Sequence, residues 1–133
     1  MKLITLLIFV LMTISGCAST SKISEAIVVQ ANGDKAQLER AFKLASNMRE
    51  VLPNAKFEVV VFGPAVKLLT YVSDEVPLIQ KMQTENISIV ACGRSLQTDN
   101  VKESELAPGV TVTPFGAVHI VNRQKQGWQY FRP

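Results

Sequence analysis

The order of apolar and polar residues divides much of this chain into two kinds of segment. Short continuous apolar runs, rich in β-branched residues, predict strands that are buried on both faces. Between them, apolar residues recur at spacings of three and four, which predicts helices with one buried face. The predicted strands are residues 26–29, 57–62, 87–92, 110–113 and 128–131, and the predicted helices are residues 35–52, 65–71, 73–84, 93–98 and 115–126. This alternation predicts an α/β fold with a mostly parallel sheet and helices on both faces, with weakly patterned residues 128–131 as an edge strand.

A different apolar pattern occupies the first 16 residues. Lys2 is the only charge there, and residues 3–14 are apolar apart from two threonines. As a helix, these residues would span roughly 18 Å, much less than the roughly 30 Å hydrocarbon core of a bilayer. This length, with the positive residue before the apolar run, predicts an export signal over residues 1–16.

Cys17 directly follows this segment. The residues before it, Ile14, Ser15 and Gly16, are one branched apolar residue and two small ones, which resembles the lipobox of bacterial lipoproteins. We therefore expect cleavage before Cys17 and lipidation of its thiol, which anchors a protein firmly because several acyl chains are attached. The alternative is a plain secretory signal followed by an unrelated cysteine. The residue after Cys17 is Ala18. An Asp at this position would favour retention at the inner membrane, so its absence favours anchoring at the periplasmic face of the outer membrane over the inner one.

The remaining chain fits a single domain. Residues 17–24 are small and polar and are expected to be a lipidated N-terminus and tether, and residues 25–133 are expected to be the folded domain. Without residues 1–16 the formal charge falls from +3 to +2, because Lys2 is removed. The basic residues form no run or stripe, so no nucleic-acid partner is expected despite a pI of about 9.0. Membrane contact is expected through the lipid alone.

Cys92 is the most informative residue for chemistry. If Cys17 is lipidated, Cys92 is the only free thiol and has no partner for an internal disulfide. It ends a predicted strand, and sites in open α/β sheets form at the carboxyl ends of strands. Unpaired N–H groups at the start of the following helix would favour a thiolate, while Arg94 would add positive charge and Gly93 would remove bulk beside the sulfur. The alternative is a buried cysteine that acts as a small apolar residue.

Two further strand ends would meet Cys92 at the same edge of the sheet. The candidates for one shared binding cleft are Asn32, Asp34, Gly63, Gly93, Arg94 and Ser95. Asp34 also has the position of a helix N-cap, which is an alternative explanation for it. Gly63 with Pro64 also suits a turn.

Other chemistry receives little support from the sequence. His119, the only histidine, follows Val118, which we expect to face the core, so His119 is expected at the surface rather than as a base. One histidine and one free cysteine argue against a zinc site, and no phosphate-binding glycine motif occurs. No metal and no cofactor are therefore expected. The aromatic residues 128–131 are interpreted as edge packing or a subunit contact.

Several segments together resemble one known family. They are residues 27–34, 57–64, 68–69, 89–96 (IVACGRSL), 108–110, 114–117, 120–121 and 126–133 (QGWQYFRP). Their order and spacing resemble the DsrE/DsrF-like sulfur-relay family over residues 25–133. The resemblance implies a three-layer α/β/α sandwich on a five-stranded, mostly parallel sheet, assembled as a homo-trimer or homo-hexamer.

In relay members of that family a strand-end cysteine accepts a sulfane sulfur as a persulfide and passes it on, and by position this role falls to Cys92. Two features depart from the family pattern. Arg94 stands where many exported relatives carry Asn, and the better-known relay members are cytoplasmic. The sequence thus leaves two hypotheses: an anchored sulfur carrier or sulfurtransferase, with an unidentified sulfane-sulfur donor and acceptor thiol, or a non-catalytic binding or assembly protein at the membrane surface.

Overall fold

The computed structural model describes residues 25–133, so the predicted export signal, Cys17 and the tether lie outside the described residues. The strands are β1 (Ala26–Asn32), β2 (Lys56–Phe62), β3 (Ile87–Cys92), β4 (Thr111–Thr113) and β5 (Gln129–Phe131). The helices are α1 (Lys35–Val51), α2 (Val76–Thr84), α3 (Gly93–Thr98) and α4 (Gly116–Lys125), with 3₁₀ turns η1 (Gly63–Leu69) and η2 (Glu103–Glu105). None of the helices in this described part is long and apolar enough to cross a membrane.

The strands form one sheet in the order β4-β3-β2-β1-β5, and each neighbouring pair is parallel. Parallel pairing requires a crossover after each strand, which the intervening helices supply. The predicted α/β fold with a five-stranded parallel sheet is confirmed, and the short β5 pairs only with β1 at one edge.

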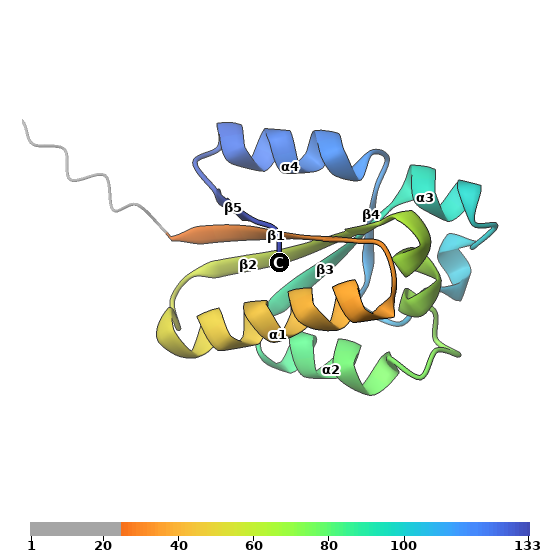
Figure 1. Cartoon of the computed structure of the whole chain (residues 1–133), viewed down its shortest axis with the longest axis horizontal. Helices are drawn as coiled ribbons and strands as arrows, with labels where there is room; N and C mark the ends of the chain where they lie inside the picture. The colour runs from red at the N-terminus through yellow and green to blue at the C-terminus, as the bar shows by residue number, and fades with distance from the viewer. Residues whose placement is uncertain (1–24) are drawn as a thin grey trace, which may run out of the picture.

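Helices cover both faces of the sheet, which makes the three layers of Figure 1. The larger core lies under α1 and α2, where Leu38, Phe42, Ile79 and Met82 are fully buried. The opposite face carries α4 alone, and its core is a small cluster formed by Val28, Val60, Val90 and Ile120. The α4 layer therefore has far fewer apolar contacts with the sheet than the α1 and α2 layer.

Successive side chains of β3 point to opposite faces of the sheet and therefore lie in these two cores alternately. Ile89 and Ala91 belong to the α1 and α2 side, whereas Val90 belongs to the α4 side. Cys92 is two residues after Val90, so its side chain faces α4.

Several element boundaries differ from the sequence prediction by one to three residues, and the helix predicted over residues 65–71 is the 3₁₀ turn η1. Two of these differences have a clear local cause. β4 begins at Thr111 rather than at Val110, because Gly109 adopts a φ of +84° and the N–H of Val110 closes a turn on Ala107. The N-cap residue of α2 is Glu75 rather than Ser73 or Asp74. The hydroxyl of Ser73 instead accepts the N–H of Glu75 at 3.1 Å, which forms a turn before the helix.

Candidate functional site

Cys92 is the last residue of β3 and immediately precedes α3. Its side chain points toward the start of α4, where the backbone N–H of Gly116 donates a hydrogen bond to Sγ at 3.2 Å. The residue is only 6% exposed. The sulfur is therefore a mostly covered atom that receives a hydrogen bond from a helix terminus, where backbone N–H groups lack partners within the helix.

Gly116 permits this close approach. A Cβ at this position would lie 3.1 Å from Cβ of Cys92 and 3.0 Å from Cδ1 of Phe62. Any larger residue would require Phe62, Cys92 or α4 to shift by a few tenths of an ångström. The first turn of α4 thus comes close enough to donate to the thiol because residue 116 has no side chain.

The surroundings lower the pKa of Cys92. Burial alone raises the pKa of this thiol, but the N–H of Gly116, the hydroxyl and N–H of Ser95 and the N–H of Arg94 all stabilise the thiolate. Together they outweigh burial and hold the pKa below the ordinary value of 9.0. Because the thiolate is the nucleophilic form, this environment increases the reactive fraction near neutral pH.

Ser95 links the thiol to the end of β2. Its Oγ accepts the N–H of Gly63 at 2.9 Å, so its hydroxyl proton remains available to Cys92. Gly63 has a φ of +68°, and a Cβ there would lie 2.5 Å from Oδ1 of Asn32. The ends of β1, β2 and β3 therefore meet through Asn32, Gly63, Ser95 and Cys92, as the parallel sheet requires.

Asp34 has a different role in the structure. Its Oδ1 accepts the N–H of Gln37 at 3.0 Å, and it is the N-cap residue of α1. The N-cap predicted from the sequence is thus present. Among the described contacts, none joins the Asp34 side chain to the group around Cys92.

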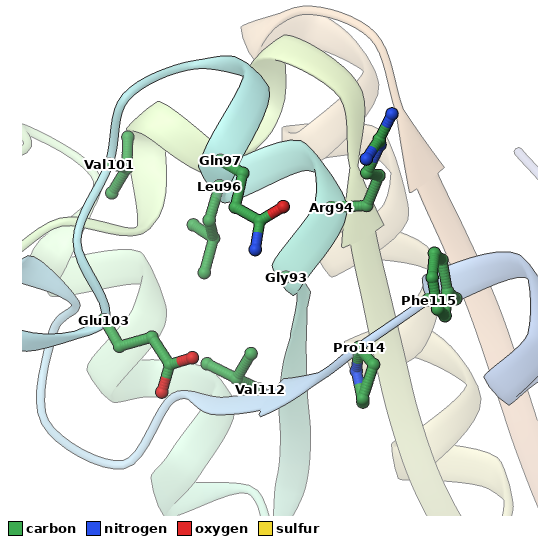
Figure 2. A pocket seen from close by; sticks show the side chains of 9 residues that line it. All are labelled: Gly93, Arg94, Leu96, Gln97, Val101, Glu103, Val112, Pro114 and Phe115. Carbon is green, nitrogen blue, oxygen red and sulfur yellow. The ribbon is translucent and has the colours of Figure 1, made fainter.

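A cavity of about 410 Å³ lies between α3 and the end of β4, and it is lined by Gly93, the residue after Cys92, but not by Cys92 itself. Its lining residues are Gly93, Arg94, Leu96, Gln97, Val101, Glu103, Val112, Pro114 and Phe115. Figure 2 shows the Gln97 amide and the Glu103 carboxylate directed into it, while the Arg94 guanidinium points away. Of the predicted cleft residues, the cavity brings together Gly93 and Arg94, whereas Asn32, Gly63 and Ser95 belong to the neighbouring cluster around Cys92.

The start of α3 is fixed against β4. The N–H of Arg94 donates to the carbonyl of Pro114 at 3.1 Å. A Cβ at Gly93 would lie 3.3 Å from the carbonyl oxygen of Thr113, so the small residue after Cys92 lets the two segments approach. The same contact forms one wall of the cavity.

The sequence analysis was wrong about the orientation of α4. Val118 is 54% exposed rather than core-facing, because the helix contacts the sheet through Gly116 and Ile120, which are buried one turn apart. His119 consequently lies toward the sheet, where its Nε2 is 2.8 Å from a carboxylate oxygen of Glu58. His119 is partly exposed, as predicted, but it has a partner that the sequence did not reveal.

The same carboxylate also binds Arg123. Nε of Arg123 donates to Glu58 at 2.9 Å, and its Nη2 donates to the other carboxylate oxygen. Glu58 lies in the apolar run of β2, where nothing in the sequence indicates a buried carboxylate. Sequence reasoning missed this cluster, and it missed Gly116 because a backbone donor leaves no side-chain pattern.

Within the described residues, no three His, Cys, Asp or Glu side chains are grouped so that they could hold a metal ion. The chemistry that this edge of the sheet presents is therefore that of a single thiol with hydrogen-bond donors and an adjoining cavity.

The family of the protein can now be stated from comparison with known proteins. A family model described as the DsrE/DsrF-like family matches residues 24–133. The chain belongs to the DsrE/DsrF-like family. This match covers the whole described fold, from β1 through the Cys92 segment to β5.

Solved structures agree with the DsrE/DsrF-like fold. The protein of unknown function MTH1491 from Methanobacterium thermoautotrophicum is 28% identical, with a TM-score of 0.72, over 82% of this chain and 99% of its own. The ychN protein from E. coli (17% identity, TM-score 0.69) covers 80% of this chain and 99% of its own. BT1422 from Bacteroides thetaiotaomicron (18% identity, TM-score 0.65) covers 80% and 93%. The last two show likeness of fold alone, and no curated protein matches the chain.

Proposed function

We propose that this DsrE/DsrF-like protein is a thiol-based sulfur carrier or sulfurtransferase in which Cys92 is the persulfide acceptor. The observation that carries the proposal is the Gly116 N–H donated to Sγ of Cys92 at 3.2 Å, in surroundings that lower the pKa of the thiol. Membership of a family that is often linked to sulfur relay supports the same assignment.

The chemistry is a displacement at sulfur. The Cys92 thiolate attacks the outer sulfur of a sulfane-sulfur donor such as thiosulfate. A new S–S bond forms on Cys92, the S–S bond of thiosulfate breaks, and sulfite leaves with the electron pair. An acceptor thiolate then attacks the outer sulfur of the persulfide, and Cys92 leaves as a thiolate.

The surroundings of Cys92 affect which sulfur donor and which acceptor can take part in this displacement. Because Cys92 is only 6% exposed, a small donor fits the first step better than a bulky one. The backbone N–H groups that stabilise the thiolate would also stabilise the negative charge of the persulfide. We expect an acceptor to bind in the cavity of about 410 Å³ that Gly93, the residue after Cys92, helps to line.

The cellular setting is part of the proposal. Residues 1–16 would direct export, and lipidated Cys17 would anchor the protein at the periplasmic face of a bacterial membrane, more favourably the outer one. The support is the lipobox-like sequence from Ile14 to Cys17. In this setting the donor and acceptor would be molecules of the periplasm.

Intact-mass measurement tests the central step. In a Cys17→Ser chain, Cys92 is the only thiol. After treatment with thiosulfate or polysulfide, we expect a gain of one sulfur mass that a reducing agent removes. The matched control is the Cys17→Ser, Cys92→Ser chain, which should gain nothing. No added sulfur on the parent chain, or equal addition to both chains, would contradict the proposal.

A second candidate function is a non-catalytic binding or assembly protein, in which Cys92 is a buried residue that only fills space in the core. The exposure of apolar residues on α4 and at its N-cap favours it: Val118 is 54% and Val121 48% exposed on the helix, and the N-cap residue Phe115 is 57% exposed. The burial of Cys92 fits it as well. Alkylation of the folded Cys17→Ser chain separates the two candidates, since rapid labelling of Cys92 near neutral pH would contradict a purely structural role for this residue.

A further inference from the structure

A buried carboxylate ties α4 to the sheet. Glu58 projects from β2, and its side chain is only 9% exposed. Its Oε2 lies 2.8 Å from Nε2 of His119 and 2.9 Å from Nε of Arg123, while its Oε1 accepts Nη2 of Arg123. Both partners come from α4, four residues apart on one face. One side chain of the sheet is thereby joined to two successive turns of the helix.

This ionic contact forms a large part of what holds α4 in place. The apolar cluster under the helix has only one buried helix residue, Ile120, against Val28, Val60 and Val90, with the partly buried Phe62 and Trp128 packed against it. Arg123 adds a contact with Trp128, whose ring centre is 4.6 Å from the guanidinium carbon. With so little apolar burial, the position of α4 on the sheet depends strongly on the carboxylate.

The position of α4 also determines the environment of the thiol. Gly116 is the first residue of α4, and its N–H is the donor to Sγ of Cys92. His119 follows one turn later on the face that meets the sheet. A helix moves as a rigid element over such a short length, so a shift of α4 at His119 displaces the Gly116 donor as well.

We propose that Glu58 is a positioning residue that, through His119 and Arg123, holds α4 where the Gly116 N–H meets the Cys92 sulfur. The inference rests on the proposed function for the role of the thiol, but it adds residues that act on that thiol indirectly. None of the three residues has a described contact with Cys92.

The charge of Glu58 suits this role. Burial raises the pKa of Glu58, but hydrogen bonds and charge from Arg123 and His119 lower it by more than burial raises it. The net pKa of Glu58 therefore lies below its ordinary value. Glu58 is therefore ionised at neutral pH and binds both partners with charge-assisted hydrogen bonds.

The test is the pH dependence of Cys92 alkylation by iodoacetamide in the Cys17→Ser chain. Glu58→Gln keeps the shape of the side chain and removes its charge. We expect the alkylation profile to move to higher pH and the rate near neutral pH to fall about two- to tenfold, which corresponds to the loss of one modest hydrogen bond to the thiolate.

The matched control is Glu75→Gln, on the other side of the sheet. Glu75 is also buried, at 5% exposure, and is paired with Lys35 at 2.5 Å. Its loss should lower stability and leave the alkylation profile unchanged. His119 gives a second pair of variants: His119→Gln retains an N–H donor for Glu58 and should keep the parent profile, whereas His119→Leu should shift it.

The outcomes separate this inference from the proposed function. An unchanged profile in both Glu58→Gln and His119→Leu, with the proteins folded by circular dichroism, would overturn the positioning role. If Glu58→Gln does not fold, the His119→Leu and His119→Gln pair decides. A parent chain that takes up no sulfur, yet shows the expected profile shifts, would overturn the proposed function while leaving the positioning role intact.

Discussion

At the scale of single residues, the environment of Cys92 consists mainly of backbone donors. The sequence predicted the position of Cys92, because a strand end followed by Gly93 and a helix start is visible in the residue order. It could not predict the donor from Gly116, since the tertiary fold brings a backbone N–H from 24 residues away. Glu58 was hidden for a related reason: its partner His119 is 61 residues away.

The lowered pKa of Cys92 links folding stability to pH. In the unfolded chain the thiol titrates near its ordinary value of 9.0, whereas in the folded chain it titrates lower. Between these two values the unfolded state binds more protons, so stability rises with pH there. The contribution is fully present above the unfolded pKa and is lost as pH falls through the folded pKa.

We therefore expect the free energy of unfolding of the Cys17→Ser chain, relative to the same chain with Cys92→Ser, to increase as pH rises toward about 9. Urea unfolding of both chains over a series of pH values measures this difference. A difference that stays flat, or that decreases with rising pH, would show that the folded protein does not favour the thiolate.

At the scale of elements, the hydrophobic pattern predicted all five strands and the four α-helices, most directly where an element buries a regular apolar stripe, as β1, β2, β3 and α1 do. Its failures lie where local contacts compete. The turn at Gly109 keeps Val110 out of β4, and the Ser73 hydroxyl forms a turn before α2. The orientation of α4 was missed because Val118 and Val121 are as apolar as Ile120, and only the fold shows which of them meets the sheet.

The N-cap of α1 gives a test at this scale. Asp34→Ala removes the acceptor for the Gln37 N–H, so we expect a loss of about 1 kcal/mol in the free energy of unfolding. Asp34→Ser keeps a capping oxygen and should recover most of it. Urea unfolding measures both effects. If Asp34 only caps α1, neither variant changes the alkylation rate of Cys92, and a slowed rate in Asp34→Ala alone would indicate a role beside the thiol.

At the scale of the whole molecule, the two helical layers are unequal. One layer has two helices, α1 and α2, over a large core, whereas the other has α4 alone, with apolar residues turned away from the sheet. Exposed apolar residues that form a patch are typical of protein contacts. Because the family resemblance of the sequence implied such an assembly, we propose a homo-trimer or homo-hexamer that forms through this layer.

Native mass spectrometry tests the assembly. The Cys17→Ser chain should appear as a trimer or hexamer, and the double variant Val118→Glu, Val121→Glu should dissociate it to monomers. Val51→Glu is the matched control, because Val51 is 77% exposed at the end of α1 in the opposite layer. A monomeric parent chain would refute the assembly, and dissociation by Val51→Glu as well would point to a different contact surface.

The predicted anchor is also a property of the whole molecule. The full-length protein, expressed in a bacterial host, should incorporate labelled palmitate and fractionate with membranes. Cys17→Ser should lose both properties, while Cys92→Ser should keep both. Labelling that persists in Cys17→Ser would exclude Cys17 as the lipid attachment site.

The parallel direction of the strands has a consequence for how such an anchored protein would stand on a membrane. The described chain enters the sheet at Ala26, at the amino end of β1, whereas Cys92 lies at the carboxyl end of β3. The seven residues of β1 separate these two ends by roughly 20 Å. A lipid attached ahead of β1 would place the sheet as a spacer between bilayer and thiol. The reactive edge would then face the open compartment, within reach of water-soluble partners.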